Sequence, residues 1–459
     1  MRSRTRRAAA RLESRVQKVA SRAQLSTKKL HCASLTRHNA IVRYPPQPPG
    51  HGVLLSTGRD LERARQLEEE TLRLSKAKLG NEHPMTLHAL ASVASDYSAL
   101  GMHEQVLPLC QEILRFRHKR LGEDHPETIQ SMHNLADAYL SLGRIEEVLP
   151  LYRDAVRINE LQHGEKDART LRSRADLANG LRRLGQHTEA VQEIEEVLRL
   201  KKIVYDENSP EIFSAIHEVS RIYSAAGQFD KALDLEEKTR ARALKVLGPD
   251  HEDSIYCLDM LSLRYLETAV MQAWLGRQES LARTAERMIA NTRDSNLQVA
   301  LERTAKVWSF LPQATPERRA EILSAATRAV ERGKNSNFLI YFQMALGMSQ
   351  YRSGLYADAD STPAATVASQ SAKEDTHVQA TCAFYRAMGL HHQGNAAEAL
   401  SLAKATAQRM KPLPADESQP LAGNSNIDDL IVWMACKEAK SLIGFEVVET
   451  NQTEQNSNP

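Results

Sequence analysis

The chain has 459 residues, of which 42% are hydrophobic, 5% aromatic and 26% charged. Its 20 glycines and 17 prolines are too few for a collagen-like or low-complexity chain, and its apolar runs are too short to span a bilayer. The five cysteines form no CxxC pair, which argues against a disulfide framework or a zinc knuckle and favours a reducing, cytoplasmic location: they are Cys32, Cys110, Cys257, Cys382 and Cys436.

The first 50 residues differ in charge from the rest. They hold twelve Lys and Arg against a single acid, Glu13, so a chain of net charge +2 has a balance of about minus nine beyond this stretch. We predict that residues 1–57 are a basic, Pro-containing, disordered tail. An Arg-rich segment with almost no acids is also typical of a transit peptide, a nucleic-acid-binding arm or an anchor for anionic membranes.

A second interpretation of residues 1–57 comes from the segment that follows. Glu62–Gly80 has the pattern of the second helix of a helix pair, yet prolines fill Asn39–Thr57, where the first helix would lie. On this interpretation the ancestral chain continued upstream in repeats. Residues 1–57 would then be a replacement sequence, from a shifted reading frame or a misassigned start.

From about Arg59 the chain repeats with a period of 42 residues. One glycine series marks the loop between units, with Asp206 in its only gap, and a second series follows 21 residues later. The two series are Gly80, Gly122, Gly164 and Gly248, and Gly101, Gly143, Gly185 and Gly227. Several independent positions that share one period indicate a repeated structural unit.

Each unit has the pattern of two helices joined by a tight turn. Pro126 suits the first turn of a helix, where its missing N–H is not needed, and Gly143 suits the turn that ends it. Apolar residues at steps of three and four mark helix A before Gly143 and helix B after it, and the two helices can bury their apolar faces only by stacking on neighbouring units. The sequence Asp124-His125-Pro126 is therefore interpreted as a loop and first turn, and not as a catalytic or metal site.

These residues resemble a known family. Leu135, Ala136, Tyr139 and Gly143 match the tetratricopeptide pattern, and the loop "LGxxHPxT" with its 42-residue period is similar to the kinesin light chain variety of that repeat. The resemblance covers roughly residues 59–269. It implies an all-α fold, a right-handed solenoid of antiparallel helix pairs that binds a partner segment along its concave side.

The resemblance also implies which helix A positions line the concave groove. Arginines dominate the middle of this set, and guanidinium groups hold carboxylates in bidentate fashion, so an acidic peptide or a C-terminal carboxylate is the expected ligand. A solvated helix face with salt bridges to its neighbours is the alternative. The groove residues are Gln130, His133, Asp137, Arg172, Asn179, Arg182, Arg183, His217 and Arg221.

The second half departs from the period. Ala269 occupies the fifth turn position and the glycine comes later, at Gly276, so helix A should be about two turns longer there. Turn motifs at Gly354 and Gly394, spaced by 40 residues, predict a second and weaker helical-repeat array. Prolines then interrupt the pattern, and residues 427–444 predict one closing amphipathic helix.

Residues 301–312, 341–359 and 428–443 are similar to the C-terminal helical regions of bacterial serine/threonine protein kinases that carry tetratricopeptide arrays. The kinase glycine-rich loop, its lysine strand and its HRD and DFG motifs are absent from the sequence. The alternative function is thus a catalytically empty regulatory fragment of such a kinase.

The predicted organisation is a tail at 1–57, a repeat array at 58–290, a second array at 291–411, a linker and closing helix at 412–443, and a disordered tail at 444–459. We predict a protein-binding scaffold and not an enzyme, with no cofactor, no metal, no small-molecule substrate and no membrane span. The acidic balance of the folded part disfavours nucleic acid.

Overall fold

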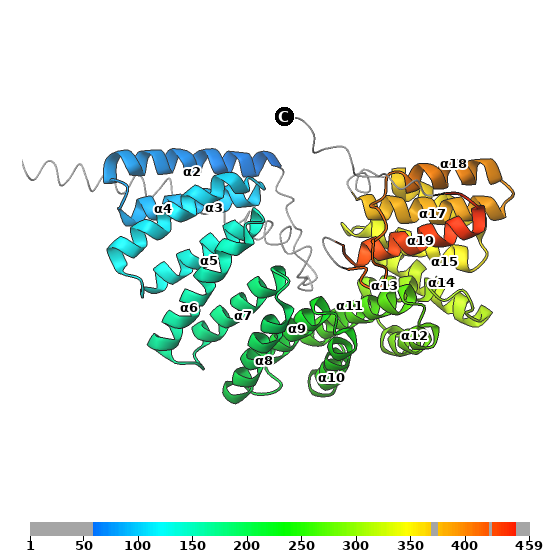
Figure 1. Ribbon diagram of the computed structural model, residues 1–459, viewed down its shortest axis with the longest axis horizontal. Coiled ribbons are helices and arrows are strands. Elements are labelled where there is room, and N and C mark those ends of the chain that lie inside the picture. The colour runs from blue at the N-terminus through cyan, green and yellow to red at the C-terminus, as the bar shows by residue number, and fades with distance from the viewer. Residues whose placement is uncertain (1–57, 369–374, 422–424, 447–459) are drawn as a thin grey trace, which may run out of the picture. The chain divides into compact units, whose positions relative to one another are not determined.

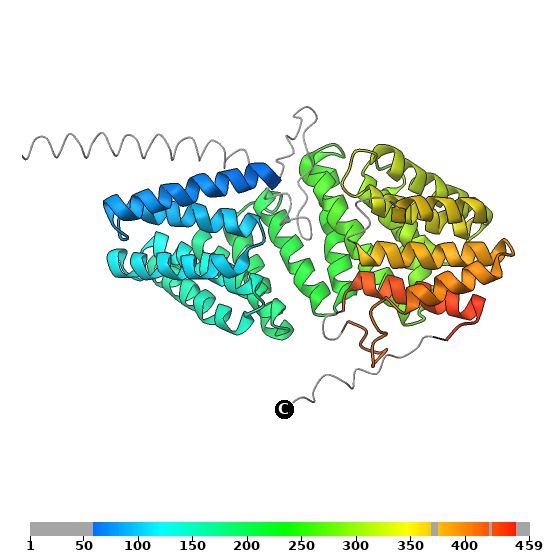
Figure 2. The same ribbon diagram turned by 90° about the horizontal axis from the view of Figure 1, so that it is seen from above.

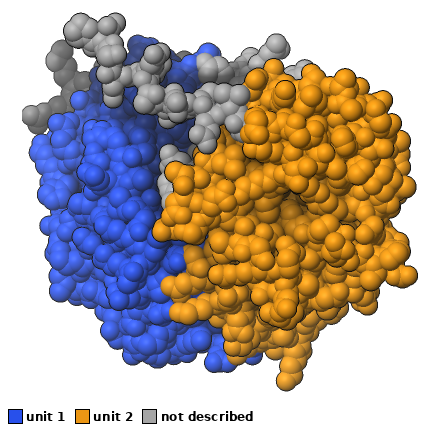
Figure 3. All heavy atoms as spheres, turned by 45° about the vertical axis from the view of Figure 1, so that its right-hand side comes forward, with its two compact units in different colours: residues 1–226 blue, residues 227–459 orange. Residues whose placement is uncertain are grey.

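The computed structural model describes residues 58–368, 375–421 and 425–446, and side chains from residue 65 onward. The predicted tail at 1–57 and almost all of the predicted tail at 444–459 lie outside the described residues. No β-strand occurs in the described part of the chain, and the expected all-α solenoid of antiparallel helix pairs is confirmed. The described residues divide into two compact units, one ending at Ala226 and the other starting at Gly227 (Figure 3).

The first unit consists of α2 and three complete helix pairs, followed by the first helix of the next pair (Figure 1). Helices α3, α5, α7 and α9 are the A helices of their repeats and form the inner layer of this unit, with α4, α6 and α8 as the outer layer. The bounds are α2 Gly58–Leu79, α3 Pro84–Ala99, α4 His103–Leu121, α5 Pro126–Ser141, α6 Val148–His163, α7 Ala168–Arg183, α8 His187–Val204 and α9 Pro210–Ala225, with a short 3-10 turn Ile145–Glu147 before α6.

The loop before each helix A has one construction. His125 is the N-cap of α5, where its imidazole Nδ1 accepts a hydrogen bond from the backbone N–H of Glu127 at 3.2 Å, and Pro126 is in the first turn. His83 and His251 cap α3 and α11 in the same way, at 3.2 Å each. Asp167 takes over this role at α7. The DHP sequence is thus a helix cap, as the sequence interpretation required.

Both glycine series have the left-handed backbone that their positions demand. The loop glycines Gly80, Gly122, Gly164 and Gly248 have φ between +83° and +91°, and the turn glycines Gly101, Gly143, Gly185 and Gly227 have φ between +70° and +74°. A side chain at such a φ is strained, which explains the spacing of the glycines. Asp206 does not have a positive φ, so the loop after α8 follows a different path.

The second unit continues the helix pairs. Its helix A in the fifth repeat, α11, is 23 residues long against 16 in α9, and the turn glycine is Gly276, which confirms the predicted extension. Gly354 and Gly394 join α15 to α16 and α17 to α18, the two pairs of the predicted second array. The bounds are α10 Phe229–Leu247, α11 Glu252–Trp274, α12 Gln278–Thr292, α13 Gln298–Ser309, α14 Pro316–Arg332, α15 Leu339–Arg352, α16 Tyr356–Ala368, α17 Thr376–His392, α18 Ala396–Ala407 and α19 Ile427–Ile443.

The closing helix α19 is part of the core of the second unit. It packs against α11, α17 and α18, and Figure 2 shows it running beside α17 and α18. Trp433 of α19 is 1% exposed and belongs to one apolar cluster with Tyr265 of α11. Asn426 and Asp429 form a capping box at its start. In the first unit the buried residues form smaller clusters, each within neighbouring repeats, as expected of a stacked array. The predicted domain boundaries stay predictions.

Candidate functional site

The implied groove residues belong to α5, α7 and α9, three helices of the inner layer (Figure 1). They differ in exposure. Gln130, Asp137, Arg172 and Arg183 are exposed; Asn179, Arg182 and Arg221 are half-buried; His133 and His217 are buried, at 8% and 6%. The two histidines therefore present little surface to a partner and support the groove from behind.

His133 joins α5 to α7. Its Nε2 lies 3.2 Å from the Ser173 hydroxyl, which also accepts a hydrogen bond from the Asn159 amide at 2.9 Å. Its Nδ1 lies 3.1 Å from a carboxylate oxygen of Asp176. His133 Nδ1 is buried without a hydrogen-bond partner, so the contact with Ser173 is the hydrogen bond that links His133 to α7.

Asp137 and Asp176 make the α5 end of the inner face acidic. The Tyr152 hydroxyl donates to Asp137 at 3.3 Å. Although Asp137 is reached by solvent, desolvation by the surrounding protein and the nearby charge of Asp176 raise its carboxyl pKa, while Tyr152, His133 and Arg183 oppose that shift. The Nε of Arg172 lies 3.9 Å from a carboxylate oxygen of Asp176, and the Arg172 side chain is 70% exposed. Most of its guanidinium is therefore in solvent.

Arg221 is held by its neighbours. Its guanidinium donates to the Asn179 side-chain oxygen at 2.6 Å and pairs with the Glu218 carboxylate. The Asn179 amide donates in turn to Glu218 at 3.3 Å. Much of the hydrogen-bonding capacity of Arg221 is therefore used inside the protein.

Arg182 and Arg183 have fewer hydrogen-bond partners within the protein than Arg221. The Nε of Arg182 is buried and has no hydrogen-bond partner. Burial, followed by repulsion from Arg221 and Arg183, lowers the pKa of Arg182 to about 10, and Glu218 only partly opposes this. Arg183 is exposed, and no ion pair to it is found within the described residues. Positive charges that repel one another around an unused donor favour an incoming anion.

Asp176 and Glu218 were missed in the sequence analysis. They neutralise part of the arginine charge, and they lie 42 residues apart, at the repeat position of Asn134. Extending the repeat comparison by one position would have found both. The groove therefore carries fewer unpaired cations than its arginine content indicates.

Metal and membrane sites were also sought. Among the residues that the structure describes, no group of three or more His, Cys, Asp or Glu side chains is placed to hold a metal ion. Within the same residues, no helix combines the length and the apolar character needed to cross a bilayer.

Comparison with known proteins identifies the repeats. Residues 93–161 and 166–245 match one tetratricopeptide repeat family, and residues 52–84 match a second family of the same description. No curated protein matches the chain. These matches end at residue 245, so the kinase-associated resemblance of residues 301–443 stays a prediction.

Solved structures similar to the chain have low overall agreement. The TPR-like repeats of a Podosopora anserina protein described as a kinesin light chain, and their Q17M variant, are each 24% identical with a TM-score of 0.41, covering 50% of this chain and 98% or 96% of theirs. BtubC (BKLC) from P. vanneervenii is 19% identical with a TM-score of 0.37, covering 51% of this chain and 92% of that one.

Proposed function

Because residues 52–245 carry tetratricopeptide repeats, we propose that the chain is a non-catalytic scaffold that binds a partner protein on the inner faces of α5, α7 and α9. Tetratricopeptide repeats stack into extended surfaces suited to protein–protein interaction. The partner segment is acidic or ends in a free C-terminal carboxylate. The unsatisfied Arg182, beside Arg183 and Arg221, is the observation that carries this proposal.

The charge distribution along the inner face supports one binding direction. Asp137 and Asp176 lie toward α5, and Arg182, Arg183 and Arg221 lie at the C-terminal ends of α7 and α9. A partner segment with basic residues at one end and carboxylates at the other would match both the acidic and the basic part of this surface. Like charges facing one another cost free energy, so the reverse direction is disfavoured.

A carboxylate suits the Arg182 site for a physical reason. Guanidinium–carboxylate hydrogen bonds are charge-assisted and can be bidentate, and each is worth about 1.5–3 kcal/mol when water is excluded. Burial has already removed water from the Nε of Arg182 and repulsion from Arg221 and Arg183 disfavours its charge, so a carboxylate bound beside the exposed Arg183 offsets part of that repulsion.

The test uses the full chain and a library of random peptides displayed with free C-termini. We expect selected peptides to be enriched in Asp and Glu or to lose affinity when their C-terminus is amidated. Reversing Arg182 and Arg183 to Glu should weaken these peptides at least tenfold, as measured by fluorescence anisotropy at a fixed, low salt concentration.

A matched double variant controls for net charge. Arg199→Glu with Lys202→Glu makes the same change of four charges on exposed positions of α8, in the outer layer. This variant should bind the selected peptides with nearly unchanged affinity. If it weakens binding as much as the Arg182 and Arg183 reversal, or if the library shows no acidic preference, the proposed groove is wrong.

We also propose a reducing, cytoplasmic location for the chain. The four cysteines within the described residues are buried and none of them forms a disulfide, and burial raises the thiol pKa of Cys110 and Cys436 to about 11 each. Buried thiols with raised pKa values are inert side chains of the core.

A further inference from the structure

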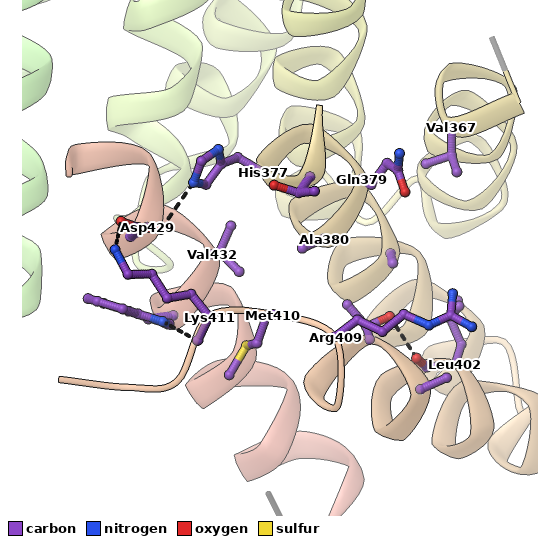
Figure 4. Close-up of a pocket in the computed structure, with 15 residues that line it drawn as sticks. Val367, His377, Gln379, Ala380, Leu402, Arg409, Met410, Lys411, Asp429 and Val432 are labelled. Carbon is purple, nitrogen blue, oxygen red and sulfur yellow. Dashed lines mark hydrogen bonds and ion pairs between the residues drawn. The ribbon is translucent and has the colours of Figure 1, made fainter. Parts of the chain in front are cut away.

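A second candidate site lies in the second unit, away from the proposed groove. A cavity of about 360 Å³ opens between α17, α18, α19 and the segment that follows α18 (Figure 4). This volume lies within the range of about 300–1,000 Å³ that is usual for small-ligand sites. The sequence analysis did not predict it.

Small side chains on facing helices create the space. Ala380 and Ala383 on α17 and Ala405 on α18 line the cavity, and Val432 of α19 and Leu402 of α18 complete its apolar walls. Two packed helices with larger residues at these positions would close the gap. The cavity can therefore bury the apolar part of a narrow ligand.

The segment along the rim is fixed in place. The indole N–H of Trp433 donates to the backbone carbonyl oxygen of Lys411 at 2.9 Å, which ties the rim to a fully buried ring. Lys411 reaches the buried carboxylate of Asp429 at 3.0 Å. The opening is thus bordered by side chains whose positions are set by the core.

The polar side chains of the lining carry an excess of positive charge. Asp429 is the only carboxylate among them, and its oxygens are occupied by Lys411, by His377 at 3.0 Å and by the backbone N–H of Asn426 at 2.9 Å. Arg409 leaves the same rim segment on the other side, toward Leu402 in Figure 4, and is exposed. Within the described residues no hydrogen bond or ion pair from its guanidinium is found.

We propose that this cavity binds a small organic anion: an apolar aromatic or aliphatic body buried against Ala380, Ala383 and Val432, with one carboxylate held by Arg409 at the rim. Asp429 is already paired with Lys411 and hydrogen-bonded to His377, so it does not repel the ligand strongly and is not free to hold a cation. The apolar body supplies affinity and the guanidinium supplies the preference for an anion.

The test compares three ligands that share the same apolar group and differ in charge. 4-Phenylbutyrate, 4-phenylbutanol and 4-phenylbutylamine are titrated into the full chain by isothermal titration calorimetry. We expect the acid to bind at least tenfold more tightly than the amine, with the alcohol between them. Arg409→Gln should weaken the acid about tenfold and leave the alcohol unchanged.

Two variants test the location. Ala383→Leu fills the cavity from α17, and Ala405→Leu fills it from an exposed position of α18, where an added side chain is less costly to the fold. Variants with wild-type circular dichroism should lose binding of both the acid and the alcohol. Absence of acid binding at millimolar concentration, tighter binding of the amine, or undiminished binding to both folded leucine variants would overturn the proposal.

Discussion

The hydroxyl of Thr128 donates a hydrogen bond to the backbone carbonyl oxygen of Gly122 at 2.8 Å, across the loop that starts α5. The same bond recurs from Thr86 to Gly80 at 2.7 Å and from Thr170 to Gly164 at 2.8 Å. In the next repeat Asp206 and Ile212 occupy the two positions, so donor and glycine are replaced together. In the fifth repeat Gly248 keeps its positive φ, while the hydroxyl of Ser254, at the Thr128 position, is buried without a hydrogen-bond partner. The bond is therefore a feature of the first three loops and is not required by the left-handed glycine.

Replacing Thr128 by Val keeps the shape of the side chain and removes the donor. We expect the free energy of unfolding of the first unit to fall by about 1 kcal/mol, because one buried hydrogen bond is lost. Thr128→Ser, which keeps the hydroxyl, should lose less. Urea denaturation followed by circular dichroism measures both, and equal stability of the Val and Ser variants would contradict this role.

The buried carboxyl groups Glu68 and Asp96 make stability depend on pH. Desolvation and the charge of Asp96 raise the pKa of Glu68 to about 7. Desolvation raises that of Asp96 to about 6, with Arg65 opposing and Glu69 adding to the shift. Because both pKa values are raised on folding, the folded state binds protons more tightly than the unfolded state. The stability that this pair contributes is therefore fully present below about pH 4 and is lost as the pH rises to about 7.

Asp96→Asn should reduce this slope and increase the free energy of unfolding at pH 8 by about 1–2 kcal/mol. Denaturation midpoints between pH 4.5 and 8 provide the measurement. Asp154→Asn, at an exposed position of α6, is the control and should leave the slope unchanged. An Asp96 variant with the wild-type slope would show that the pair does not titrate in this range.

We expect Arg182 to lower the free energy of unfolding and to increase the affinity for acidic peptides. Replacing it with Met removes a half-buried, mutually repelled charge and keeps the length of the apolar stem, so the free energy of unfolding should be unchanged or rise by up to about 1 kcal/mol. Affinity for acidic peptides should fall at the same time. A Met variant that is strongly destabilised would instead show that Arg182 is a structural residue with an internal partner.

Arg352 holds the closing helix to the second unit. Its guanidinium binds the two carboxylate oxygens of Glu438 on α19 at 2.5 and 2.6 Å, and its Nε donates to the carbonyl oxygen of Ser309 at 2.6 Å. Arg352→Lys cannot make all three bonds. We expect a loss of about 2 kcal/mol, since a partly buried carboxylate remains without its partner.

Hydrogen–deuterium exchange of residues 427–443 should then become faster in the Arg352→Lys variant. Lys440→Met is the matched control, because it removes an ion pair to Glu446 in which both side chains are exposed, and such pairs contribute less than about 1 kcal/mol. Equal exchange in the two variants would mean that apolar packing alone holds α19.

Periodic features of the fold could be predicted from the sequence, and single long-range contacts could not. The positions of Gly143 and Pro126 predict a turn and a helix start because backbone geometry restricts the residue type at each. The cavity beside α17 is lined by Ala383 of α17 and Ala405 of α18, two alanines that no local pattern distinguishes from the other alanines of these helices. Three-dimensional packing is needed to find it.

The sequence predicted which positions form the candidate groove, but not which of their charged side chains are exposed and unpaired. The resemblance supplied the helix A positions, and these residues belong to α5, α7 and α9, three helices of the inner layer. The exposure of each side chain could not be derived in this way, because the burial of His133 depends on Ser173 and Asp176 of α7, the next helix A. Whether the positions bind a partner is still a prediction.

The extension of α11 joins the fifth repeat to the closing helix. Seven added residues make nearly two whole helical turns, so the apolar face keeps its direction within about 20° while the helix grows by about 10 Å. Trp274, in this added length, lies 5.9 Å from the ring of Trp433 and donates to the carbonyl oxygen of Glu417 at 2.8 Å. The added turns therefore tie the middle of the chain to a segment 143 residues later, a link that stacking of neighbouring repeats alone does not provide.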